Sequence, residues 1–227
     1  MRKTKFQTGE YYHIYNRGVD KRKVFMDEKD YVKFVYNLNI LNNDLTKIER
    51  KNFISECRSS KSAPSAGAAL GADFEILSKL PKLVDIICYC LIPNHYHFML
   101  KQIADNGISK FMHKLADSYG LYFNKKHNRS GSLFQGPFKE IHIKKDSYLL
   151  WLSGYINGNP EIHKIAKAEN YKWSSYQDYL GKRNGNLCDK NVILKDFKNI
   201  REYKDLVDII IKESRQKKSD IRKYMLE

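Results

Sequence analysis

The sequence predicts an α+β fold in which an antiparallel sheet carries helices on one side. Segments typical of strands and of helices follow one another, without the regular alternation that a parallel sheet requires. Hydrophobic residues make up 42% of the 227-residue chain and aromatic residues 13%. This composition supports a hydrophobic core and excludes a disordered chain.

The first strand and helix are predicted near the start of the chain. Residues 11–19 (YYHIYNRGV) alternate as a strand does. Residues 27–43 predict a helix with Asp27 as its N-cap and acidic residues in its first turn. The apolar face of this helix consists of Tyr31, Phe34, Val35 and Leu38.

A hairpin is predicted after a segment of different composition. Residues 58–72 are rich in small residues, which is typical of a flexible insertion or loop. Residues 83–92 form an apolar run of strand length, and residues 95–101 predict a second strand after a turn at Pro93 and Asn94. The short turn predicts that the two strands are antiparallel neighbours.

The next predicted elements are a helix and a strand. Residues 107–128 predict a helix. Its apolar positions are Ile108, Phe111, Met112, Leu115 and Tyr119. Residues 129–145 predict a loop and then a strand or hairpin that ends in EIHI.

A third helix is predicted over residues 146–160, with Asp146 as its cap. Pro160 should stop it near Asn157 or Gly158, because the residue before a proline avoids the helical region. A charged helix is predicted from about 196 to 218. The order strand, helix, strand, strand, helix, strand, helix indicates a ferredoxin-like sheet.

We therefore predict one domain over residues 1–185 and a basic helical extension over residues 186–227. Residues 190–227 hold 11 basic and 7 acidic residues. This excess mildly favours a contact between the extension and DNA.

The net charge of +15 favours a polyanionic partner. Residues 1–23 hold seven Lys and Arg against two acids, and residues 121–145 hold six against one. Aromatic residues are interleaved in both segments, and this combination is typical of a surface that binds single-stranded nucleic acid. A lysine-rich proteome is the alternative explanation of the charge.

The cysteines form no CxxC pair, and we expect free thiols in a reducing cytoplasm. They are Cys57, Cys88, Cys90 and Cys188. A zinc site made by Cys88, Cys90 and the two histidines described next is the alternative. The sequence contains no apolar run of about 18 residues that would span a membrane, and its first residues lack the apolar core of a signal peptide.

His95 and His97 lie two residues apart in the segment CLIPNHYHFML. On a strand they point to the same face. Two imidazoles side by side can bind a metal. Two ordinary half-buried histidines would give the same pattern.

Tyr155 and Asn159 lie four residues apart, on one side of the third predicted helix. A tyrosine hydroxyl can attack a phosphodiester when a cation withdraws charge from the phosphate. The Asn carbonyl could bind that cation, and a set of two nitrogens and one oxygen suits Mg²⁺ or Mn²⁺. The alternative is a core stripe of Tyr148, Leu152 and Tyr155 before a helix stop.

Five segments together resemble the HUH single-tyrosine transposases of the insertion-sequence type, in particular the REP-associated tyrosine transposases. The resemblance covers about residues 9–180. The segments, in chain order, are YHIYNRGV, YCLIPNHYHFML, GSLFQGPFKEIHI, YLLWLSGYINGNP and YKWSSYQDYL.

The resemblance implies a ferredoxin/RRM-like antiparallel sheet that carries the histidine pair, with the tyrosine on a helix packed nearby. It implies that His95, His97 and Asn159 are metal ligands, with Mg²⁺ or Mn²⁺ as the cofactor, and that Tyr155 is the nucleophile. Pro137 stands where the family often has an arginine, and Lys139 is the candidate to replace that phosphate contact.

The implied activity is that of a metal-dependent endonuclease and strand transferase acting on single-stranded DNA, usually near a hairpin. Cleavage gives a 5′-phosphotyrosine link and a free 3′-OH, and a second 3′-OH reverses the reaction without ATP. The implied location is the cytoplasm, at the nucleoid. Both a monomer and a homodimer are compatible with this activity.

We expect DNA contacts from the basic segments, and the candidates are Arg17, Lys125, Lys126, Arg129 and Lys139. One rival hypothesis is a catalytically silent hairpin-binding module derived from such a transposase. Another is a zinc-dependent hydrolase with Glu140 or His142 as its general base. The hydrolase would leave Tyr155 and the basic charge unexplained.

Overall fold

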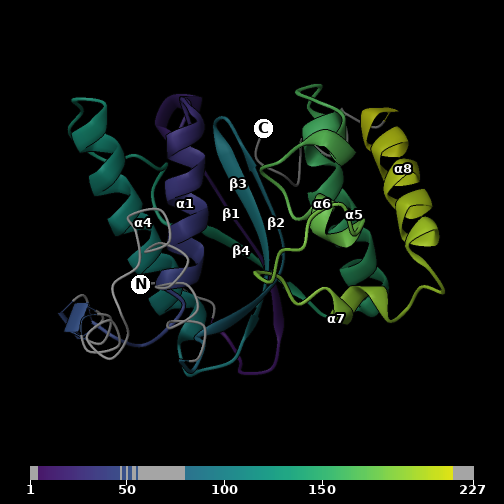
Figure 1. The fold of residues 1–227 in the computed structure, drawn as a ribbon, viewed down its shortest axis with the longest axis horizontal. Helices are drawn as coiled ribbons and strands as arrows, with labels where there is room; N and C mark the ends of the chain where they lie inside the picture. Colours follow the sequence, from purple (N-terminus) through teal and green to yellow (C-terminus); the bar gives the residue numbers. More distant parts are fainter. Residues whose placement is uncertain (1–4, 47, 50, 53–54, 56–79, 217–227) are drawn as a thin grey trace.

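The computed structural model describes residues 5–46, 48–49, 51–52, 55 and 80–216 (Figure 1). The insertion predicted at 58–72 and the sequence after 216 lie outside these residues. The main elements are β1 (Tyr11–Arg17), α1 (Glu28–Ile40), β2 (Val84–Ile92), β3 (His95–Gln102), α4 (Gly107–Lys126), β4 (Lys139–Ile143), α5 (Asp146–Ile162) and α8 (Ile200–Gln216). The short ones are η1 (Val19–Lys21), η2 (Ala168–Asn170), α6 (Tyr176–Tyr179) and α7 (Asn191–Leu194).

The four strands form one antiparallel sheet in the order β2-β3-β1-β4. β2 and β3 are a hairpin, as the short turn predicted. β1 and β2 are joined through α1, and β3 lies between them. This is the ferredoxin-like arrangement expected from the order of elements, and the predicted fold class is confirmed.

Helices cover both faces of the sheet, whereas the sequence predicted helices on one side (Figure 1). Tyr96, Phe98 and Leu100 of β3 share a core with α1 and α4. Met99 shares a second core with Leu152 and other residues of α5. Because successive residues of a strand point to opposite faces, a central strand that is apolar on both faces needs a cover on each.

Helix α1 begins as predicted, with Asp27 as its N-cap. The Asp27 side chain accepts a hydrogen bond from the Asp30 backbone N–H, and the Asp30 side chain accepts one from the Asp27 backbone N–H. This reciprocal capping box satisfies two donors that the first turn would otherwise leave without partners.

Helix α5 differs from its prediction at both ends. Lys145, rather than Asp146, is the N-cap, and the helix runs through Pro160 to Ile162. A proline removes only one backbone donor. After Pro160 the chain is held by hydrogen bonds from the His163 N–H to the Asn159 carbonyl (3.0 Å) and from the Ile165 N–H to the Pro160 carbonyl (2.8 Å).

Helix α8 packs along the outer side of α5, so the predicted extension shares the second core. Its buried residues are Tyr203, Val207, Ile210, Ile211 and Ser214. Two glycines of α5 allow the close approach. A Cβ on Gly154 would lie 2.5 Å from Ile210 Cδ1, and one on Gly158 would lie 2.7 Å from Ile211 Cγ1.

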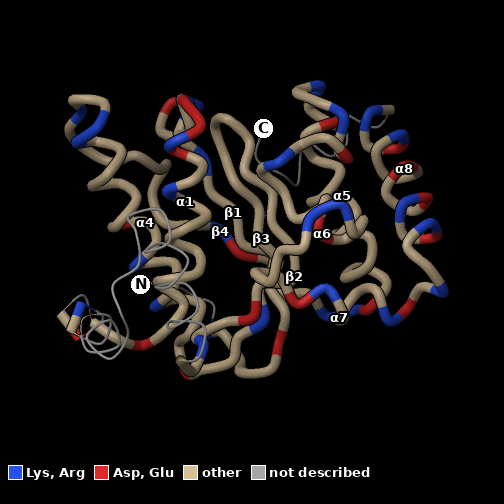
Figure 2. Tube along the Cα trace, viewed as in Figure 1, with Lys and Arg blue, Asp and Glu red and all other residues tan. Residues whose placement is uncertain are grey.

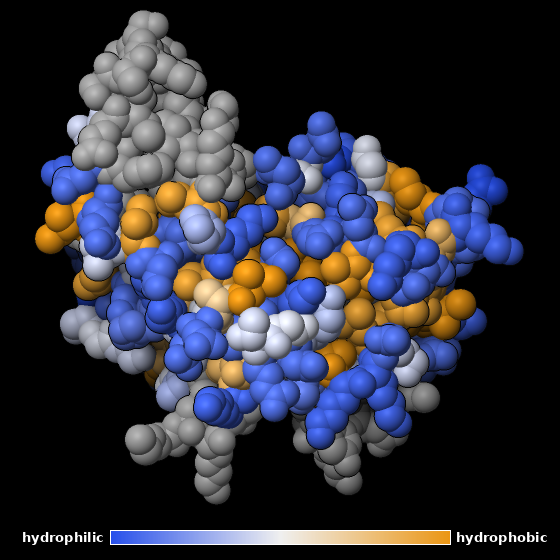
Figure 3. Space-filling model, turned by 90° about the horizontal axis from the view of Figure 1, so that it is seen from below, coloured by the Kyte–Doolittle hydropathy of each residue, from blue (hydrophilic) through white to orange (hydrophobic). Residues whose placement is uncertain are grey.

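None of the helices in the described part of the chain is long and apolar enough to cross a bilayer. Seen from below, hydrophilic residues are spread over the molecule and hydrophobic ones lie between them (Figure 3).

We expect Gly158→Val to lower the free energy of unfolding by about 1–3 kcal/mol, because the added side chain overpacks the contact between α5 and α8. Gly120→Ala is the control: a Cβ at that position of α4 would meet no atom within 4 Å. It should raise the free energy by about 0.5–1 kcal/mol through helix propensity. Urea unfolding of both variants measures the difference, and equal stability would contradict the close packing.

Candidate active site

The histidine pair lies on the face of β3 that α5 covers. His95 is paired in register with Arg17 of β1, and His97 with Tyr15. The two imidazole rings are 5.0 Å apart between centroids, which confirms that they share a face. Only 4% of His95 and 2% of His97 is exposed.

Both imidazoles are neutral in this environment. Burial lowers the pKa of His95 to about 3, and electrostatic interactions with His163 and Arg17 are smaller causes of the same direction. Burial also holds the pKa of His97 well below its ordinary value, with His95, His13 and His163 as smaller causes. A neutral imidazole keeps a nitrogen lone pair, which a metal ion requires.

Tyr155 of α5 faces the histidines. Its ring lies edge-on to the His97 ring, 6.0 Å away between centroids. The Trp151 ring stacks on it at 5.4 Å, and the residue is 4% exposed. Asn159, one helical turn further on, is fully buried.

Three of these side chains carry buried polar atoms that have no hydrogen-bond partner among the described residues. The atoms are Nε2 of His95, Nε2 of His97, and Oδ1 and Nδ2 of Asn159. Buried polar atoms are nearly always satisfied, so this concentration calls for an explanation. Two imidazole nitrogens and an amide oxygen fit a divalent cation.

The described residues contain no group of three or more His, Cys, Asp or Glu side chains that could hold a metal ion. The candidate set is different in kind, because an asparagine supplies its third ligand. Cys88, Cys90 and Cys188 are buried free thiols, whereas Cys57 lies outside the described residues. The alternative zinc site therefore gains no support here.

Three further residues next to the histidines were not predicted from the sequence. His13 Nε2 lies 2.9 Å from His97 Nδ1, and Asn94 Oδ1 lies 2.8 Å from His95 Nδ1. The His163 ring, at the end of α5, is 5.3 Å from that of His95. His13 could have been found from the alternation of β1, which places it on the same face as Tyr15.

The candidate DNA-binding residues fall into two groups. Arg17 is buried beside His95, and Lys139 is exposed on β4 opposite Tyr15. The other group lies at the end of α4, on the opposite side of the sheet, and consists of Lys125, Lys126 and Arg129. Lys and Arg gather at helix ends and in loops rather than in the middle of the sheet (Figure 2).

Lys126 belongs to an ion-pair network at the start of α1. It lies 2.6 Å from Asp27 Oδ1 and 2.7 Å from Asp30 Oδ1, and His127 lies 3.0 Å from Asp30. Burial alone would raise the pKa of Asp30, but hydrogen bonds from Lys126, the Met26 N–H and His127 outweigh it and lower that pKa. The network gives Lys126 a structural role.

The two proposed bases of the hydrolase hypothesis lie on the wrong face. Glu140 is in register with Ile14, and His142 with Tyr12. Both partners belong to the core under α1 and α4. The His142 ring stacks on Tyr12 at 4.8 Å, so neither residue faces His95 and His97.

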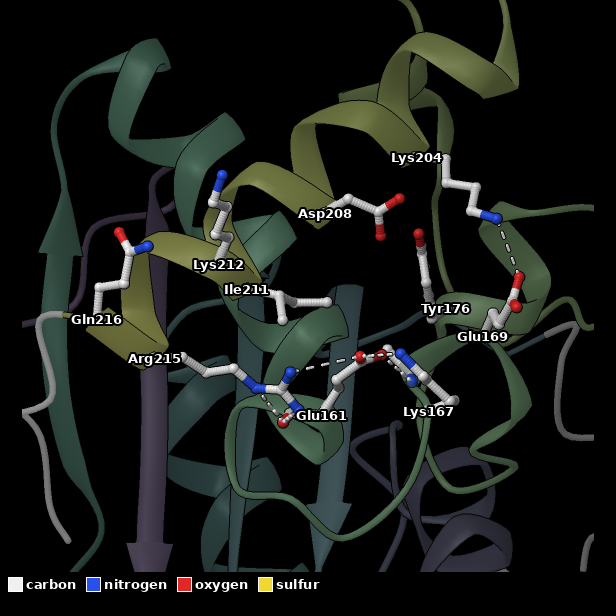
Figure 4. Close-up of a pocket in the computed structure, with 11 residues that line it drawn as sticks. Glu161, Lys167, Glu169, Tyr176, Lys204, Asp208, Ile211, Lys212, Arg215 and Gln216 are labelled. Atoms are coloured by element: carbon white, nitrogen blue, oxygen red, sulfur yellow. Dashed lines mark hydrogen bonds and ion pairs between the residues drawn. The ribbon is translucent and has the colours of Figure 1, made fainter.

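A pocket of about 620 Å³ lies between α8 and the segment that follows α5 (Figure 4). Arg215 donates to the Glu161 carbonyl at 2.6 Å. Lys167 pairs with Glu161 at 2.7 Å, and Lys204 with Glu169 at 3.1 Å. Arg215 therefore ties α8 to the end of α5, and Lys204 ties it to η2. The lining contains none of the candidate catalytic residues.

One family model matches part of this chain. The model of the family "Transposase IS200 like" matches residues 77–159, a range that contains the histidine pair, Tyr155 and Asn159. Over this part of the chain, the match confirms the resemblance that the motifs indicated. A solved structure of a REP-associated tyrosine transposase bound to a REP hairpin is 12% identical, with a TM-score of 0.47 over 80% of this chain and 85% of that one. No curated protein matches the chain.

We expect Lys126→Gln to lower the free energy of unfolding at pH 7 by about 1–2 kcal/mol, because Asp30 loses a charged hydrogen-bond donor. The exposed neighbour provides the control, since Lys125→Gln should change stability by less than about 0.5 kcal/mol. Denaturant unfolding as a function of pH measures both.

The pH dependence follows from Asp30. A carboxyl whose pKa is lowered on folding stabilises the fold above its unfolded pKa, and this contribution is lost as the pH falls through the folded pKa. The gap between wild type and Lys126→Gln should therefore narrow in acid. A gap that stays constant from pH 7 to pH 2 would contradict the network.

Proposed function

We propose that this protein nicks and rejoins single-stranded DNA at hairpin-containing ends, with Tyr155 as the nucleophile and a 5′-phosphotyrosine intermediate. The observation that carries the proposal is the set of buried, unsatisfied atoms of His95, His97 and Asn159, together with the Tyr155 ring beside His97. The match to a transposase family over these residues supports it.

His95 and His97 would hold a divalent cation, Mg²⁺ or Mn²⁺, through their Nε2 atoms, and Asn159 would hold it through its amide oxygen. The cation, when bound, withdraws charge from the scissile phosphate. The protein contributes neutral ligands that need no deprotonation, because burial keeps both imidazoles uncharged.

Tyr155 would attack phosphorus in line. Its Oη forms the new bond to phosphorus and gives up its proton, the bond to the 3′ oxygen breaks, and that oxygen leaves as a 3′-OH. The Trp151 ring stacked on Tyr155 restricts the rotation of the nucleophile. The phosphotyrosine link retains the energy of the phosphodiester, so rejoining needs no nucleotide triphosphate.

One chain supplies all four residues, so a monomer would be sufficient. The site is closed to solvent in this conformation, since Tyr155 is 4% exposed. A DNA phosphate can therefore reach it only after the side chains that close the site have moved. Arg17 and Lys139 would guide the phosphate there, and Lys125 and Arg129 would contact more distant DNA of the nucleoid. Lys126 is engaged by Asp27 and Asp30 instead.

The direct test is incubation with labelled hairpin DNA from the flanks of the gene, with and without Mg²⁺. We expect a metal-dependent protein–DNA adduct that survives SDS, and at least 1,000-fold less of it with Tyr155→Phe (about 4 kcal/mol in the barrier). Tyr176→Phe is the matched control, because the Tyr176 hydroxyl is buried and has no hydrogen-bond partner among the described residues. Tyr176 lines the pocket beside α8, which contains none of the candidate catalytic residues. Tight binding without adduct or nick would favour the silent module.

The second test concerns the DNA surface. Each neutralised phosphate contact should reduce the slope of log K against log salt by about 0.7 for single-stranded DNA. We expect this reduction for Lys139→Gln, which is exposed on the side of the candidate site. Comparing this slope with that of Lys125→Gln, at the end of α4, then shows which side of the sheet the DNA contacts. An unchanged slope for both would show that DNA binds elsewhere.

A further inference from the structure

His13 has no role in the reaction described so far, although it contacts the candidate site. It is fully buried in the middle of β1, and its ring lies 5.2 Å from that of His97. Its Nε2 is 2.9 Å from His97 Nδ1. Its other nitrogen, Nδ1, is buried and has no hydrogen-bond partner among the described residues.

The position of one proton decides whether His97 can bind a cation. A neutral imidazole carries a proton on one nitrogen only, so Nε2 of His97 has a free lone pair only when Nδ1 carries the proton. In that form, the Nδ1–H donates to His13 Nε2, and His13 carries its own proton on Nδ1. In the opposite form, His13 donates to His97, and the proton on His97 Nε2 blocks a cation.

The same logic applies to His95 through a different partner. Asn94 Oδ1 lies 2.8 Å from His95 Nδ1, and Asn94 Nδ2 donates to the Lys21 carbonyl at 3.3 Å. The second bond orients the amide so that its oxygen faces the imidazole. An oxygen can only accept, so His95 carries its proton on Nδ1 and keeps Nε2 free.

We propose that His13 and Asn94 are positioning residues: each accepts the Nδ1–H of one histidine of the pair, His97 and His95 respectively, and so presents both Nε2 atoms to the cation. This inference rests on the proposed function, because it assumes that the pair binds a divalent cation. Such outer partners fix the tautomer and orientation of metal-bound histidines in general.

A purely structural role for His13 explains less. The core around it would be filled equally well by an apolar side chain, which would leave no buried Nδ1 without a partner. Among the described residues, the hydrogen bond to His97 is the polar contact that distinguishes the imidazole from such a side chain. A role in fixing the tautomer of His97 requires this hydrogen bond, and it is compatible with a buried His13 Nδ1 that has no partner among the described residues.

The test compares variants that differ only in the acceptor. His13→Leu removes it, whereas His13→Gln offers an amide oxygen near the former Nε2. Asn94→Ala and Asn94→Asp form the corresponding pair for His95. His142→Leu removes an imidazole from the opposite face of the sheet and serves as the control. Circular dichroism establishes that each variant is folded.

Mn²⁺ binding to the full chain is measured by isothermal titration calorimetry without DNA. We expect His13→Leu and Asn94→Ala to weaken binding 10- to 100-fold. His13→Gln and Asn94→Asp should stay within about threefold of wild type, and His142→Leu should be unchanged. Long-range ¹H–¹⁵N NMR of the Mg²⁺-saturated protein should place the protons of His95 and His97 on Nδ1.

The outcomes separate the two proposals. If wild type binds no Mn²⁺ and His95→Ala changes nothing, the proposed function fails, and this inference fails with it. If wild type binds Mn²⁺ through the pair and folded His13→Leu and Asn94→Ala bind equally well, only this inference is overturned. A His97 proton on Nε2 in the Mg²⁺-saturated protein would also overturn it. If His13→Leu does not fold, the Asn94 variants and His13→Gln decide.

Discussion

Helix α5 is held between the sheet and helix α8, and the placement of the candidate catalytic residues depends on this packing. On its inner side, Tyr155 meets the histidine face of β3. On its outer side, Gly154 and Gly158 let the isoleucines of α8 approach to contact distance. Tyr203 of α8 also accepts a hydrogen bond from Asn157 of α5 at 2.8 Å. The C-terminal extension therefore supports the helix that carries the proposed nucleophile.

The same packing excludes water from the histidine pair and sets its chemistry. Burial keeps both imidazoles neutral, which suits a metal ligand. It also leaves polar atoms of His95, His97 and Asn159 without partners. Each unsatisfied buried group costs roughly 1–3 kcal/mol. Folded domains have a free energy of unfolding of about 5–15 kcal/mol, so such a cluster lowers it by a large fraction. A bound cation would satisfy these atoms and remove that cost.

The sequence predicted the elements that follow from local pattern. Strand alternation predicted that His95 and His97 share a face, and helical spacing predicted that Tyr155 and Asn159 lie on one side of α5. What it missed depends on contacts between distant residues. Helix α5 continues past Pro160 to Ile162, which packs in the second core. The ion pair between Lys126 and Asp30 joins two helices.

The partners of the histidines illustrate the same limit. Asn94 precedes His95 in the chain, yet only the orientation of its amide in the structure shows that its oxygen faces His95 Nδ1. His13 is 84 residues away from His97. A module that only bound DNA would gain stability by replacing this buried polar set with apolar side chains of similar volume. The chain instead combines neutral imidazoles, oriented tautomers and an adjacent tyrosine, an arrangement that is useful for chemistry and costly for binding alone. This cost favours the enzyme over the silent module.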